Sequence, residues 1–130
     1  TKALAQEEGS FLLGKIDWAL TGTQTINQPT NDGNILSVTK FGSNPDNPIV
    51  IAVVDGDMTI SRGGSPAVVL NNSNTSVTCP NFSGNCFRHE SASGDGINPE
   101  RLEATFRMHA TTSDGLPFSQ DFTTVKYLRR

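Results

Sequence analysis

Residues Thr1–Leu20, TKALAQEEGSFLLGKIDWAL, are the stretch from which the expected fold is built. Apolar residues recur here every three or four positions, which predicts an amphipathic helix. The main apolar face covers an arc of roughly 120°, at about 100° per residue, and consists of Ala5, Gly9, Leu12, Leu13, Ile16, Ala19 and Leu20. A second, narrower stripe lies on nearly the opposite side and consists of Leu4, Phe11 and Trp18.

Two apolar faces are more than a helix needs to cover one sheet. We therefore expect the helix to pack on its own domain and also to meet another surface. Residues Ala5, Leu12, Leu13, Ile16, Ala19 and Leu20 are expected to make the contact with the sheet. The alternative, in which loops of the same domain cover the second stripe, stays open from the sequence alone.

The beginning of this segment is poorly built for an isolated helix. Gly9 and Gly14 each cost about 1 kcal/mol relative to alanine in a helix interior. No serine or aspartate precedes a clean first turn at Thr1 to cap the helix. We expect the chain to start inside a longer helix whose upstream part is missing. An ordinary N-terminal helix carrying a short expression remnant is the alternative.

The length and the charge of the chain limit the classes of protein to which it can belong. The 130 residues predict one domain that is large enough to bury a core. A formal net charge of −3, without a basic stripe, argues against a nucleic-acid partner. No apolar run reaches the roughly 20 residues of a membrane span.

The two cysteines, Cys79 and Cys86, lie in the stretch CPNFSGNC. Pro80 and Gly84 allow the six intervening residues to turn back, so we expect a disulfide and an oxidising, extracytoplasmic location. A metal site is the weaker alternative, because His89 and His109 show no paired ligand spacing.

After the helix, expected over residues 1–21, the polar residues 22–34 predict a loop, and residues 35–130 predict a β-rich region. The Asp55-Gly56 pair between two β-branched runs predicts a hairpin with a type I′ turn. Residues 67–70 predict a short buried strand, and the alternation over residues 102–110 predicts a half-buried strand. The expected fold class is α+β, an amphipathic N-terminal helix packed on one antiparallel sheet, as a single domain.

The sequence offers little for catalysis or for cofactor binding. No nucleophile elbow, phosphate-binding glycine loop or zinc-protease motif is present. His89 and His109 are expected to be solvated, and the pairs Asp55/Asp57 and Asp95/Glu100 match no calcium-loop spacing. Three glycosylation sequons, at Asn71, Asn74 and Asn81, are what an Asn/Ser-rich loop produces by chance. We expect neither an enzyme nor a bound cofactor or metal.

Two segments carry a resemblance to a known family. The stretch AQEEGSFLLGKIDWALTGTQTIN, residues 5–27, resembles the exposed helical half of minor pilins and pseudopilins, and the ending FTTVKYLRR is similar to their last strand. The order of helix, strands and one disulfide resembles the globular part of a type IV pilin-like protein. The Cys79–Cys86 loop lies in mid-chain rather than near the C-terminus, which favours a minor subunit.

The resemblance implies a structural subunit of a type IV pilus or of a related type II secretion or DNA-uptake filament. It implies anchoring in the bacterial inner membrane through the missing upstream helix, and later a place in a pilus at the cell surface. Its partners would be other pilin or pseudopilin subunits and the inner-membrane assembly machinery. In that setting Leu4, Phe11 and Trp18 would contact neighbouring subunits. A secreted module that binds a carbohydrate or protein is the alternative, and a small extracellular enzyme ranks third.

Overall fold

The computed structural model describes residues 2–42, 44–95, 97–111 and 115–128. One helix, α1 (Lys2–Leu20), precedes a chain made almost entirely of strands. The helix matches the expected 1–21 closely, although Thr1 lies outside the described residues. It ends where the Thr21 amide donates to the Asp17 carbonyl at 3.0 Å, and Gly22 follows with a φ of +71°, a left-handed conformation that suits glycine.

The strands form two antiparallel sheets. Sheet A has the spatial order β1-β3-β4-β5-β6. Its strands are β1 (Thr23–Gln28), β3 (Ile35–Lys40), β4 (Ile49–Val54), β5 (Asp57–Arg62) and β6 (Val68–Val69). The β4–β5 turn has φ values of +51° at Asp55 and +85° at Gly56, which confirms the hairpin predicted from that dipeptide.

Sheet B has the order β10-β9-β8-β2, with β7 also paired to β9. Its two long strands are adjacent and run antiparallel along their whole length. One edge of β9 pairs with β10, and the other pairs with β8 along its first half and β7 along its second. The strands are β2 (Asp32–Gly33), β7 (Thr75–Thr78), β8 (Phe87–Glu90), β9 (Glu100–Thr111) and β10 (Pro117–Leu128).

The expected α+β fold with one sheet is wrong. About half of the described chain is strand, so the protein is mostly β, with two antiparallel sheets and a single helix. The stretch expected to be a loop, residues 22–34, contains β1 in sheet A and β2 in sheet B. The pairing of β1 with β3 shifts register twice, which breaks the two-residue alternation and leaves only Thr23 and Ile26 of β1 buried.

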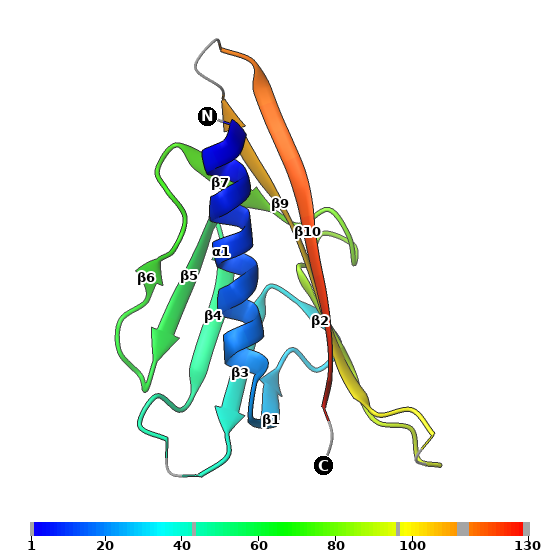
Figure 1. Cartoon of the computed structure of the whole chain (residues 1–130). Coiled ribbons are helices and arrows are strands. Elements are labelled where there is room, and N and C mark those ends of the chain that lie inside the picture. Colours follow the sequence, from blue (N-terminus) through cyan, green and yellow to red (C-terminus); the bar gives the residue numbers. More distant parts are fainter. Residues whose placement is uncertain (1, 43, 96, 112–114, 129–130) are drawn as a thin grey trace.

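The core is one continuous cluster shared by the helix and both sheets. It joins Leu12 and Ile16 of α1 to Ile51 of sheet A and Phe106 of sheet B. The helix stands in front of the strands and alongside β10 (Figure 1). The division of the chain into domains stays a prediction of the sequence, that of a single domain over residues 1–130.

One smaller expectation also differs. The segment 67–70 was expected to be a buried strand, but β6 has only two residues, Val68 and Val69, which are 60% and 51% exposed. It lies at the edge of sheet A, where one flank pairs with β5.

Candidate assembly surface on the N-terminal helix

The inner side of α1 is fully enclosed. Leu12, Ile16 and Ala19 have no solvent exposure, and Leu13 is half-buried against the same core. Gly9 is also buried and faces the ring of Phe122 on β10. Of the six residues expected to pack on a sheet, the structure therefore places Leu13 at the margin and the other five in the interior: Ala5, Leu12, Ile16, Ala19 and Leu20.

Polar side chains hold the flanks of the helix to the strands. The Gln6 amide donates to Gln120 at 3.1 Å, and the Thr124 hydroxyl donates to the Asp17 carboxylate at 3.3 Å. On the other flank, the Glu8 carboxylate accepts a hydrogen bond from the Asn72 amide at 2.7 Å. The helix is therefore held along its length, and the side that it turns to solvent is defined by these contacts.

The outer side carries the second apolar stripe predicted from the sequence. Leu4 is 62% exposed, Phe11 50% and Trp18 36%, so these three side chains keep much of their surface in solvent. Side chains spaced seven residues apart lie along the same side of a helix, about two turns from one another. We call Leu4, Phe11 and Trp18 the outer stripe.

Trp18 lies among three cationic side chains from three elements. The Lys40 Nζ lies 4.2 Å from the centroid of the indole ring, the Arg62 Cζ 5.0 Å and the Lys15 Nζ 5.7 Å. Cations within about 6 Å of an aromatic face are attracted to its quadrupole. Lys15 also lies 5.6 Å from the Phe11 ring, so the cations extend along the outer stripe.

Lys40 also contacts the backbone at this end of the helix. Its Nζ donates to the carbonyl oxygen of Trp18 at 2.7 Å, and a cation there complements the negative end of the helix dipole. Partial burial lowers the pKa of Lys40, and the nearby Asp46 carboxylate opposes that shift. Sequence reasoning missed this role because β3 is joined to α1 only through the tertiary fold.

The Cys79–Cys86 disulfide is present, with an S–S distance of 2.01 Å. Asn34 braces the bridged loop, since its side-chain oxygen accepts a hydrogen bond from the Cys86 amide at 2.9 Å. The loop lies between β7 and β8 of sheet B, away from the outer stripe.

The two histidines differ from each other. His109 is half-buried on β9, with its Nε2 2.7 Å from the Thr78 hydroxyl. His89 was expected to be solvated, and that is wrong, because its side chain is only 10% exposed. Its Nδ1 lies 2.8 Å from the Pro29 carbonyl and its Nε2 2.5 Å from Glu100, so it joins the chain before β2 to the start of β9.

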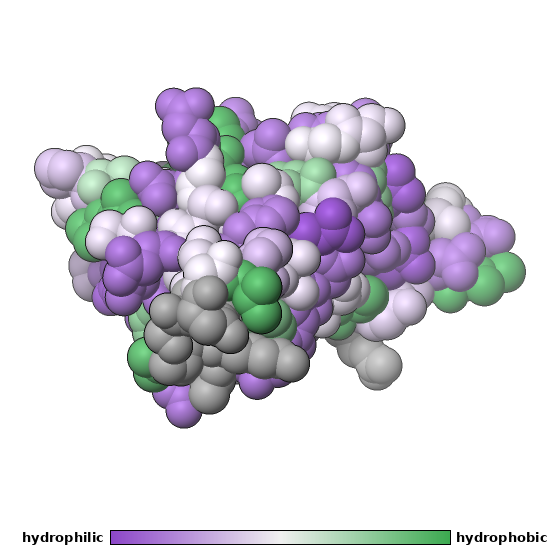
Figure 2. Space-filling model, turned by 90° about the horizontal axis from the view of Figure 1, so that it is seen from above, coloured by the Kyte–Doolittle hydropathy of each residue, from purple (hydrophilic) through white to green (hydrophobic). Residues whose placement is uncertain are grey.

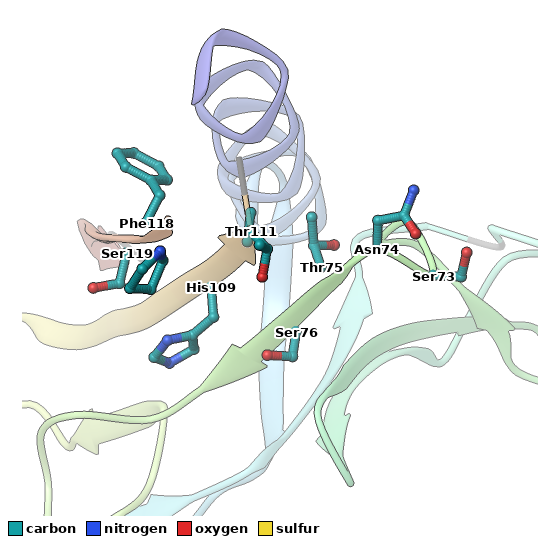
Figure 3. Close-up of a pocket in the computed structure, with 10 residues that line it drawn as sticks. Ser73, Asn74, Thr75, Ser76, His109, Thr111, Phe118 and Ser119 are labelled. Atoms are coloured by element: carbon teal, nitrogen blue, oxygen red, sulfur yellow. The ribbon is translucent and has the colours of Figure 1, made fainter. Parts of the chain in front are cut away.

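A hollow of about 460 Å³ lies where β7, β9 and β10 meet. Its lining includes the hydroxyl side chains Ser76 and Ser119 beside the His109 imidazole (Figure 3). The described lining residues contain no carboxylate that could orient the imidazole for nucleophilic catalysis. The hydroxyl and imidazole side chains of the lining are groups that form hydrogen bonds with polar ligands.

The end of the molecule near the start of α1 has a mixed surface. Purple polar residues and pale intermediate ones dominate that end, and the green apolar areas are small and separated (Figure 2). Among the described residues, no His, Cys, Asp and Glu side chains group in threes to hold a metal ion. No described helix combines the length and apolar character required to cross a bilayer.

The chain matches no protein-family model, no curated protein and no solved structure.

Proposed function

We propose that this protein is a structural subunit, a minor pilin or pseudopilin, of a type IV pilus or of a related type II secretion or DNA-uptake filament. In this proposal it assembles through its N-terminal helix. An apolar segment upstream of Thr1 anchors it in the inner membrane before assembly. Its partners are other pilin-like subunits and the membrane-bound assembly machinery, and its final place is the pilus or cell surface.

The observation that carries the proposal is the two-sided helix. One side of α1 is sealed in the core, while the outer stripe of Leu4, Phe11 and Trp18 is 36–62% exposed. Apolar side chains exposed along one side of a helix are typical of a protein–protein contact. Aromatic residues are also enriched at the centres of such contacts.

The test separates assembly from folding. Phe11→Ala and Trp18→Ala should each cost clearly less stability than a buried leucine-to-alanine change, because both rings are partly in solvent. In cells that make the full-length protein, they should reduce its incorporation into filaments. Ile97→Ala removes an apolar side chain that is 75% exposed and far from the helix, and serves as the matched control.

Two results would contradict the proposal. One is normal incorporation of the Phe11→Ala, Trp18→Ala double variant. The other is a loss of stability comparable to the ~2–5 kcal/mol cost of a buried leucine-to-alanine change, which would make the outer stripe part of the core.

A secreted binding module remains the second candidate, and the hydroxyl-lined hollow beside His109 favours it. Titration with a panel of soluble oligosaccharides, followed by NMR, would then move the resonances of Ser76, His109 and Ser119 together. Unchanged resonances at millimolar sugar would remove this candidate.

A further inference from the structure

Oppositely charged groups lie at the two ends of the helix. Around Trp18 lie Lys15, Lys40 and Arg62, which we call the cationic end. Within the described part of the chain, none of these three side chains forms an ion pair. Two carboxylates lie near this end. Asp46 interacts with Lys40, and Asp17 is turned toward Thr124 of β10.

The other end carries carboxylates. Glu7 and Glu8 lie near the start of α1, and Asp55 and Asp57 lie at the β4–β5 turn. We call these four residues the acidic end.

Hydrogen bonds to two neighbouring asparagines place the carboxylates of α1 close to those of the β4–β5 turn. Glu8 accepts from the Asn72 amide, and the neighbouring Asn71 side chain donates to Asp57 at 3.2 Å. Glu7 and Asp55 are both exposed.

The acidic end and the cationic end lie at opposite ends of β5 and of α1. Strand β5 begins at Asp57 and finishes at Arg62, so one strand joins the acidic end to the cationic end. The helix runs in the same sense, from Glu7 to Trp18, which are about 16 Å apart at about 1.5 Å per residue. In Figure 1 the start of α1 lies near the top of the view and the end of β5 lies lower, at the left.

We infer that the cationic end of one molecule binds the acidic end of a second copy of this chain, head to tail. The cations around Trp18 would pair with Glu7 and Asp55 of the second copy, and the exposed parts of Trp18 and Phe11 would become covered. Such a contact uses different surfaces on its two sides, so it does not close on itself and propagates into an open chain. The inference names the partner for the proposed filament subunit and rests on that proposal for its biological setting.

Sedimentation velocity of the 130-residue chain tests the inference directly. At about 10 mM salt, where the screening length is about 30 Å, association should increase with protein concentration. At about 1 M salt, where it is about 3 Å, association should be lost. Arg62→Glu and Glu7→Lys should each weaken association about tenfold at low salt, since each turns an attraction into a repulsion.

Sedimentation of a mixture of the two variants is the decisive experiment. The Glu7→Lys variant keeps an intact cationic end and the Arg62→Glu variant keeps an intact acidic end, so a 1:1 mixture should form heterodimers at concentrations where each variant alone is mostly monomeric. The control, Ala92→Glu with Ile97→Glu, changes the net charge as much as Arg62→Glu but at the exposed segment before β9, and should associate like the parent. Unchanged thermal midpoints would show that all variants fold.

Several outcomes would overturn the inference. A parent chain that stays monomeric at low salt up to millimolar concentration would do so. Self-association retained in full by Glu7→Lys would show that the acidic end takes no part in the contact. Failure of the mixture would also contradict head-to-tail pairing. If association behaves as inferred but filaments never contain the protein, the proposed function fails and the contact stands. If filaments contain the protein although the chain does not self-associate, the proposed function stands and the head-to-tail contact fails.

Discussion

Gly9 of the helix lies directly against the ring of Phe122 on β10. A Cβ atom built at position 9 would stand 2.2 Å from both Cε1 and Cζ of that ring. Phe122 in turn stacks on Phe106 of β9, with 5.4 Å between ring centroids. The sequence alone indicates that Gly9 weakens the helix. In the structure, the absence of a side chain at Gly9 allows the helix to approach sheet B.

Gly9→Ala should therefore destabilise the protein although alanine is the better helix former. The gain in helix propensity is about 1 kcal/mol, but displacing a stacked ring in a packed core costs about 1–3 kcal/mol. Urea unfolding should show a net loss. Gly14→Ala is the control, because nothing lies within 4 Å of a Cβ at that exposed position. It should stabilise the protein by up to about 1 kcal/mol. Equal effects of the two substitutions would refute this account.

Asn71→Ala should cost about 1–3 kcal/mol, the penalty for leaving buried polar groups unsatisfied. Asn71 is only 6% exposed. Its side-chain oxygen accepts from the Met58 amide at 2.8 Å, and its nitrogen donates to the Thr75 carbonyl at 3.2 Å. Asn74→Ala, at an exposed loop position nearby, should change stability by less than about 0.5 kcal/mol. Chemical denaturation of the two variants makes the comparison.

The burial of Asn71 also bears on the first of the three glycosylation sequons, which the sequence alone attributes to chance. The Asn71 amide is already bonded inside the fold, so this asparagine is not displayed as an acceptor for a glycan. Mass spectrometry of the chain produced in a host that attaches N-linked glycans should find Asn71 unmodified, and a glycan at that position would show that the local fold differs.

Replacing both cysteines by alanine should lower the free energy of unfolding by about 2.5 kcal/mol, the loop-closure estimate for a bridge across seven positions. Cys86 is 1% exposed, and Asn34 holds its amide from outside the loop. The native β8–β9 pairing should therefore survive in the variant. Unfolding of the parent chain with and without reductant should reproduce the difference. A reductant effect absent from the double variant confirms that it acts through this bridge.

Acid should remove the contribution of the Asp121–Arg107 pair. The two side chains lie 2.6 Å apart across β9 and β10, and the bond to Arg107 lowers the pKa of Asp121 below its usual 3.8. A lowered folded-state pKa means that the stabilisation is present above pH 3.8 and is lost as the pH falls through the folded value.

Because both side chains are almost half exposed, solvent screens the pair and its contribution to stability is small. Asp121→Asn should be less stable than the parent at neutral pH and equally stable at strongly acidic pH. The measurement is the free energy of unfolding of both proteins against pH. A difference that persists at low pH would assign the loss to packing instead of to charge.

Much of the local structure could be predicted, and the reason is visible in particular residues. The helix follows from the spacing of Leu12, Ile16 and Ala19. The β4–β5 hairpin follows from the positive φ that Asp55 and Gly56 tolerate. The long alternation of β9 follows from one buried and one wetter face. Strand β1 was missed because TQTINQ is polar and its pairing is irregular, so no two-residue period remained to be read.

The sequence by itself determined the helix with its two apolar faces, the hairpin turn and the proximity of Cys79 to Cys86, because each depends on residues within a few positions of one another. Only the tertiary structure decided that there are two sheets, that Gly9 receives Phe122, that His89 meets Pro29, and that Lys40 and Arg62 surround Trp18. These contacts join segments 20 to more than 100 positions apart. Their free energy comes from burial and from charges brought together by the whole fold, which no local pattern records.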